Sequence, residues 1–327
     1  MKYSNSYKSK QFFALVVKLF IVIGCGYFIY DKIFTNEQQS ISDFYSILAK
    51  NNVFLTKNAL FLLILTIFNW FLEILKWQTL VSFYKKISLK SASIQSLSSL
   101  TTSLITPNRI GEYGAKAVYY KKPLRKKIMA LNLVGNLSQL AVTIIFGIIG
   151  CIYLAFNFHI KFNYISALLL FFLIISLLFT IWFIDNRGFT KNGYTIQSLI
   201  KYLKTFPKNS VHKVFQLSVF RFLIFSHQFY YLILIFNIDI TYTDAIMSVF
   251  SMYVIASIIP MLSLFDVVIK SSVAMVVFAL FQVDESIILA IVLLMWIFNF
   301  VLPSIVGAYF VLTFNTDKLI LQKDDSH

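Results

Sequence analysis

Two stretches of the chain, LSSLTTSLITPNRIGEYGAKAVYY (97–120) and VFSMYVIASIIPMLSLFDVVIKSSVAM (249–275), share one pattern. Each is a moderately apolar run that a proline, Pro107 or Pro260, interrupts near its middle. Because proline removes a backbone donor and ends a helix, each stretch predicts two short helices joined at a break. Paired broken helices in corresponding halves of a membrane protein are typical of a transporter's binding site.

After its break, each stretch carries an acid and a lysine four residues apart: Glu112 with Lys116, and Asp266 with Lys270. Residues four apart lie on one face of a helix. A charge at membrane depth costs free energy and usually faces a bundle interior or a water-filled cavity. The two pairs are therefore candidate substrate contacts. A stabilising ion pair within each short helix is the alternative.

The composition is that of an integral membrane protein. Of 327 residues, 58% are hydrophobic and only 13% are charged, which is far too apolar for a soluble globule. A spanning helix needs ~20 apolar residues. Windows long enough to span occur at 11–30, 59–82, 128–156, 162–184, 214–236 and 286–312. Because the connections between them are too short for a soluble domain, we predict a single integral membrane domain over residues 1–327.

The basic residues indicate the orientation of the chain. The net charge is +15, and lysine and arginine gather in the N-terminal tail and in the connections 85–90, 121–127 and 185–213. Positively charged connections lie on the cytoplasmic side of a membrane. We therefore predict six spans in the inner or plasma membrane, with both termini in the cytoplasm. Attraction to anionic lipid headgroups accounts for the charge, so no nucleic-acid partner is expected.

This topology places the two broken stretches. Basic clusters flank 97–120 on both sides, and each of its halves is too short to span. We predict a re-entrant helical hairpin from the cytoplasm, with an amphipathic helix on the membrane surface as the alternative. The flanks of 249–275 lack lysine and arginine, which predicts a second hairpin from the outside. The predicted fold is all-α, with 59–156 and 214–312 as repeats of inverted topology, as in many transporters.

Further charges fall inside the apolar windows. Arg109 lies in the first break, where backbone donors are free for a ligand, and with Glu112 it is the first candidate for substrate contact. Glu73 and Lys76 lie three apart on one predicted helix, and a pair between them is the alternative to a role in binding. Arg221, near a cytoplasmic helix end, is expected to extend to the headgroups, with a side chain that faces the bundle interior as the alternative. The candidate substrate-binding residues are Glu73, Lys76, Arg109, Glu112, Lys116, Asp266 and Lys270.

The chemistry of these residues suits the binding of an anionic ligand and does not indicate catalysis. Cations outnumber anions within the apolar windows, and arginine matches phosphate through its forked donors. The four histidines are scattered without ligand spacing, and the sequence shows no nucleophile elbow, phosphate-binding loop or zinc motif. We therefore predict no catalytic residues, no metal and no cofactor, and a protein that is not an enzyme.

The run TPNRIGEYG (106–114) resembles the Pro-x-Arg-x-Gly-Glu signature of the flippase-like transmembrane domain of lysylphosphatidylglycerol synthases. Trp296, Asn299, Pro303 and Gly307 in the last window look similar to that family as well. The resemblance implies movement of a lipid between leaflets by a stand-alone homologue. It does not imply lysine transfer, because the soluble transferase domain of the bifunctional members is missing.

The second broken stretch departs from the family pattern. The family usually reads Pro-x-x-x-Gly-Gly-x-Gly with a nearby glutamate, whereas 260–266 has no glycine and ends in Asp266. The resemblance therefore does not define the lipid. We predict a lipid translocase that moves an anionic phospholipid or a polyprenyl-linked lipid. A membrane-embedded transferase on a lipid-linked substrate, or a non-transporting partner of a lipid-synthesis enzyme, are the alternatives.

Overall fold

The structure is a computed structural model that describes residues 49, 51, 53, 55–104, 106, 110–158, 207–258 and 266–314. The predicted spans 11–30 and 162–184 and the breaks themselves, with Pro107, Arg109 and Pro260, lie outside these residues. The described elements are α3 (Thr56–Val81), α4 (Leu89–Leu104), α5 (Ile110–Val118), α6 (Lys122–Asn157), α9 (Lys208–Ile235), α10 (Tyr242–Ile258), α11 (Asp266–Ala279), α12 (Glu285–Trp296), the π-helical turn η2 (Ile297–Val301) and α13 (Leu302–Leu312).

In the described part of the chain, four helical stretches are long and apolar enough to cross a membrane. They are Thr56–Val81, Lys122–Asn157, Asn209–Ile235 and Glu285–Leu312, and they agree with four of the six predicted windows. Large apolar side chains such as Ile67, Ile152 and Ile305 are exposed on their outer faces. Contiguous exposed apolar surface of this kind marks a face that meets lipid. The described chain is therefore an all-helical membrane protein.

The helix α6 begins earlier than its apolar window. The sequence predicts a basic connection at 121–127, whereas the structure starts the helix at Lys122, with Pro123 in the first turn. Proline is tolerated there, and lysine and arginine are good helix formers. At 1.5 Å per residue, α6 is about 54 Å long, well beyond the ~30 Å hydrocarbon layer. The basic cluster thus lies on the end of a helix rather than in a loop.

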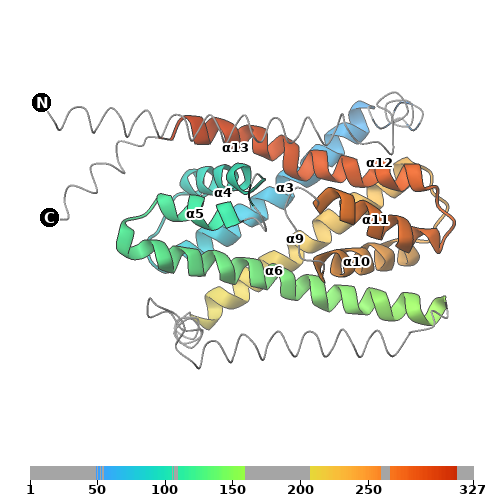
Figure 1. Ribbon diagram of the computed structural model, residues 1–327, viewed down its shortest axis with the longest axis horizontal. Coiled ribbons are helices and arrows are strands. Elements are labelled where there is room, and N and C mark those ends of the chain that lie inside the picture. Colours follow the sequence, from blue (N-terminus) through green and yellow to red (C-terminus); the bar gives the residue numbers. More distant parts are fainter. Residues whose placement is uncertain are drawn as a thin grey trace, which may run out of the picture.

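The two halves of the described chain repeat one order of elements: long helix, two short helices, long helix. Figure 1 shows that α3 and α9 run in opposite directions, as do α6 and the stretch α12–η2–α13. The pair α4/α5 lies at the left end of the view and α10/α11 at the right end, and each pair packs together. Each pair is entered from, and left toward, its own end of the molecule. The described residues form separate helices on each side of Pro107 and of Pro260.

The last long helix of each half packs on the first short helix of the other half. The first of these contacts joins α6 to α10 at Gly150. A Cβ added at Gly150 would lie only 2.5 Å from the Met247 carbonyl oxygen. That carbonyl also accepts a hydrogen bond from the Ser251 hydroxyl at 2.8 Å. Glycine is needed here because the two backbones approach more closely than any side chain allows.

The second contact joins α13 to α4 at Gly307 and has the same construction. A Cβ at Gly307 would collide with the Leu97 carbonyl oxygen. The Thr101 hydroxyl shares its hydrogen between that carbonyl, at 3.3 Å, and the Ser304 carbonyl of α13, at 2.9 Å. In both contacts a glycine therefore faces a carbonyl and a hydroxyl four residues apart on a short helix of the other half.

We expect Gly150→Ala and Gly307→Ala to destabilise the purified protein in detergent. An added methyl group forces the helices apart, and overpacking of this kind costs about 1–3 kcal/mol. Gly114→Ala is the matched control, because a Cβ at Gly114 meets nothing within 4 Å. Alanine is the better helix former, so this control should be neutral or slightly more stable. Equal thermal unfolding midpoints for all three variants would contradict the close approaches.

Candidate functional site

Three charged side chains form a buried cluster between α3 and α9. Glu73 Oε2 lies 2.6 Å from Lys76 Nζ and 3.0 Å from Arg221 Nη1. The predicted pair between Glu73 and Lys76 is present. The prediction that Arg221 extends to the headgroups is wrong: its side chain is only 17% exposed and meets Glu73. Because α3 packs on α9, the nearest anion for Arg221 is this carboxylate.

A chain of amides continues from this charge cluster across three elements. Arg221 Nε donates to Asn69 Oδ1 at 3.0 Å, and Asn69 Nδ2 donates to Asn299 Oδ1 at 2.6 Å. Asn299 Nδ2 then donates to Gln228 Oε1 at 2.9 Å, and Gln228 Nε2 to the Thr66 hydroxyl at 2.9 Å. Buried polar groups are costly unless they are hydrogen-bonded, so this chain fixes α3, α9 and η2 relative to one another.

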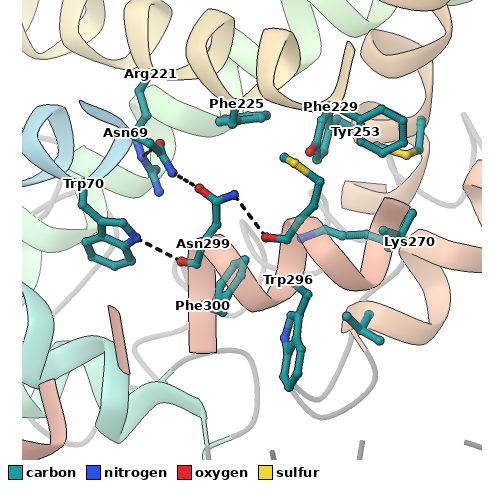
Figure 2. Close-up of a pocket in the computed structure, with 14 residues that line it drawn as sticks. Asn69, Trp70, Arg221, Phe225, Phe229, Tyr253, Lys270, Trp296, Asn299 and Phe300 are labelled. Carbon is teal, nitrogen blue, oxygen red and sulfur yellow. Dashed lines mark hydrogen bonds between the residues drawn. The ribbon is translucent and has the colours of Figure 1, made fainter. Parts of the chain in front are cut away.

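The π-helical turn η2 places Asn299 at the centre of that chain. The backbone carbonyl of Asn299 accepts a hydrogen bond from Trp70 Nε1 at 3.0 Å (Figure 2). Pro303, which lacks a backbone donor, follows in the first turn of α13. Single π-helical turns inside α-helices are frequent at functional sites. The sequence predicts the span here, but not this widened turn.

A cavity of about 150 Å³ lies against the amide chain, between α3, α9, α10, α11 and α12–η2. Its walls are largely apolar, with many aromatic side chains, as Figure 2 shows. The aromatic side chains that line it are Trp70, Phe225, Phe229, Tyr253, Trp296 and Phe300. Its polar groups include the amides Asn69 and Asn299 and two cations, Arg221 and Lys270. Such an apolar cavity with a few convergent polar groups is the usual form of a small ligand site.

The predicted pair Asp266–Lys270 borders this cavity. Lys270 Nζ lies 2.7 Å from Asp266 Oδ2 and 5.3 Å from the centre of the Phe300 ring. The Lys270 side chain is 24% exposed and that of Asp266 is 35% exposed. Asp266 is the first residue of α11 in the described chain. This pair is therefore accessible to a ligand in the cavity.

The predicted pair Glu112–Lys116 is elsewhere and is buried. Lys116 Nζ lies 2.8 Å from Glu112 Oε1 and donates to Asn132 Oδ1 at 2.7 Å. It also sits 4.4 Å from the centre of the Trp77 ring, a cation–π contact. None of these four residues lines the cavity. They tie α5 to α6 and α3.

Next to this pair, Gln95 of α4 accepts hydrogen bonds from Trp77 Nε1 at 2.9 Å and from the Tyr120 hydroxyl at 2.8 Å. Burial raises the pKa of Tyr120 to about 12, so the phenol stays protonated and keeps donating. The α4/α5 pair is thus fastened to α3 by both charged and neutral contacts.

The structure places six of the seven predicted site residues, in three pairs at three places. Lys270 lines the cavity with Asp266 beside it, and Glu73 and Lys76 join the cavity through Arg221. Sequence reasoning missed the neutral polar residues Asn69, Gln228 and Asn299 as part of the site. It also missed Gln139, which accepts a hydrogen bond from Arg221 Nη1 at 3.3 Å. A signal was present, because side-chain amides inside apolar windows seek partners on neighbouring helices. Arg109 lies outside the described residues and stays a prediction.

Among the residues that the structure describes, four helices of spanning length, two short helix pairs and a cavity with buried charges define a polytopic membrane protein with an internal polar site. The family model for the lysylphosphatidylglycerol synthase TM region matches residues 15–307. The chain therefore belongs to this family, as the run at 106–114 predicts. No curated protein and no solved structure gave a significant match.

We expect Glu73→Gln to destabilise the protein strongly. The substitution leaves Lys76 and Arg221 buried without a carboxylate, and breaking a buried pair in this way costs about 3–5 kcal/mol. Asp266→Asn is the control, since it removes the acid of a partly exposed pair, which contributes at most about 1 kcal/mol. Thermal unfolding in detergent measures both. If Glu73→Gln unfolds no earlier than Asp266→Asn, the buried cluster is not a structural centre.

Proposed function

We propose that the protein is a lipid translocase that moves an anionic lipid between leaflets, with the headgroup passing through the cavity. The observation that carries the proposal is the pairing of Arg221 and Lys270 in one aromatic cavity, at the meeting place of the two halves. Positive charge at this depth is costly and is expected where a substrate needs it. In this proposal the chain catalyses no reaction of its own.

The arrangement of the short helices supports re-entrant hairpins. Each pair is entered and left at one end of the molecule, and the two pairs occupy opposite ends (Figure 1). The α4/α5 end carries the basic clusters 85–90 and 121–127, while the other end carries Asp239, Asp284 and Glu285. By the positive-inside rule, the α4/α5 end faces the cytoplasm of the cell membrane. Six spans with cytoplasmic termini follow if 11–30 and 162–184 also cross.

Opposite directions of corresponding helices support inverted repeats. In transporters with such repeats, substrate sites lie at the repeat interface near the bilayer midplane, beside discontinuous helices. The cavity meets this description, because α3 of the first half and α9–η2 of the second half enclose it. Rocking of one half against the other would open the cavity to each leaflet in turn.

The size and chemistry of the cavity suit a headgroup rather than a whole lipid. Its volume of about 150 Å³ is below the ~300–1,000 Å³ of sites for drug-sized ligands. A phosphate with a small substituent is of this scale. Arg221 supplies a permanent charge and Lys270 three rotatable donors. The acyl chains would stay in the bilayer, against the exposed apolar faces of the spans.

Leaflet exchange in proteoliposomes tests this function. Dithionite added outside the vesicles destroys the fluorescence of labelled phosphatidylglycerol in the outer leaflet. The rate at which the remaining fluorescence is lost reports movement of labelled lipid from the inner to the outer leaflet. We expect Lys270→Met to slow exchange about tenfold or more, because a charge-assisted hydrogen bond contributes ~1.5–3 kcal/mol. Lys213→Met is the matched control, since Lys213 is exposed on α9 and outside the cavity. Wild-type rates for Lys270→Met, or no exchange above protein-free vesicles, would overturn the proposal.

A further inference from the structure

The two halves carry equivalent ion pairs in unequal surroundings. Each second short helix has an acid and a lysine four residues apart, Glu112–Lys116 in α5 and Asp266–Lys270 in α11. The separations are almost the same, at 2.8 and 2.7 Å. Geometry within the pairs therefore does not distinguish them, and any difference in role comes from what surrounds each lysine.

The pair in α5 is closed to ligands. The Lys116 side chain is 2% exposed and that of Glu112 is 6% exposed. Lys116 Nζ also donates to Asn132 and lies over the Trp77 ring. An incoming anion would have to break several buried contacts at once, which is costly in a low-dielectric interior. This pair serves to hold the helices together.

The pair in α11 is open to the cavity. The side chains of Lys270 and Asp266 are 24% and 35% exposed, and Lys270 is one of the cavity's lining residues. This partial exposure leaves both charges accessible, and an ion pair that water can reach contributes little stability. Separating it therefore costs little, and a ligand anion can replace the carboxylate at Lys270.

Arg221, the other cation of the cavity, is held more firmly. Its guanidinium contacts Glu73, Asn69 and Gln139 from two neighbouring helices. It gives the cavity a fixed positive charge, whereas Lys270 has a partner that can be exchanged. Of the two cations, Lys270 is thus the one that can pass from an internal anion to a ligand anion.

We propose that Asp266 is an internal competitor for the substrate's phosphate at Lys270, and so a specificity-determining residue. This inference rests on the proposed function. Without a ligand, the Asp266 carboxylate forms an ion pair with Lys270 Nζ. A phosphate monoanion that enters takes that place, and Asp266 turns its charge to solvent. A headgroup without net negative charge cannot compete with the carboxylate, so the pair selects anionic headgroups.

Binding to the purified full-length protein in detergent tests this role. The probe is dihexanoyl phosphatidylglycerol, and tryptophan fluorescence reports binding because Trp70 and Trp296 line the cavity. We expect Asp266→Asn to lower Kd about three- to tenfold, since the competitor is gone. Asp266→Glu keeps the competing charge and should bind about as the wild type does, and Lys270→Met should lose most affinity.

Two further probes identify the chemistry that is recognised. Inorganic phosphate tests whether free phosphate suffices, and neutral dihexanoylglycerol tests whether the acyl chains alone bind. We expect the phosphate lipid to bind most tightly, and only the two phosphate probes to respond to Asp266→Asn. If Asp266→Asn changed the Kd of dihexanoylglycerol as much as that of dihexanoyl phosphatidylglycerol, the proposed exchange of anions at Lys270 would be overturned.

The outcomes separate this inference from the function on which it rests. Weaker or unchanged binding of the phosphate lipid to Asp266→Asn, with affinity still lost in Lys270→Met, rules out the competitor and leaves the anion site intact. If Lys270→Met leaves the Kd of the phosphate lipid unchanged, both the anion site and the inference are overturned.

Discussion

The centre of the molecule depends on the two ion pairs that the Glu73 carboxylate makes. This carboxylate lies between Lys76 on its own helix and Arg221 on α9, and so holds two cations in a buried place. Ion pairs of this kind are a poor source of stability, because apolar residues of similar volume often serve as well or better. The cluster is better explained by what it provides to the cavity, a positive charge that Glu73, Asn69 and Gln139 hold in place. The amides Asn69 and Asn299 extend this order to η2.

Much of the architecture could be predicted because its causes are local in the sequence. Hydropathy marks the four spans that the structure describes, and proline marks the places where the short helices end. The partners of Arg221 could not be predicted, since Asn69 lies 152 residues away and only helix packing brings the two together. The π-helical turn at Asn299 changes the hydrogen-bonding pattern without changing the apolar composition, so hydropathy does not reveal it. The closed environment of Lys116 likewise depends on α3 and α6.

The two halves have the same type of helix contact where they pack together, but their acid–lysine pairs lie in different surroundings. Gly150 and Gly307 allow the same close approach of a long helix to a short helix of the opposite half. Such paired contacts hold the halves together at two equivalent points. The acid–lysine pairs differ, since Lys116 is buried and Lys270 borders the cavity. The described cavity is lined mainly by the second half, which explains why one pair is structural and the other is accessible.

The most direct measurement is a cryo-EM structure of the protein in nanodiscs that contain phosphatidylglycerol. The account predicts headgroup density in the cavity, with a phosphate oxygen within hydrogen-bond distance of Lys270 Nζ and the Glu73–Arg221 pair intact. It also predicts that α4/α5 and α10/α11 enter the bilayer from opposite sides. A cavity filled by an acyl chain with no phosphate near Lys270, or a short helix pair that crosses the whole bilayer, would contradict it.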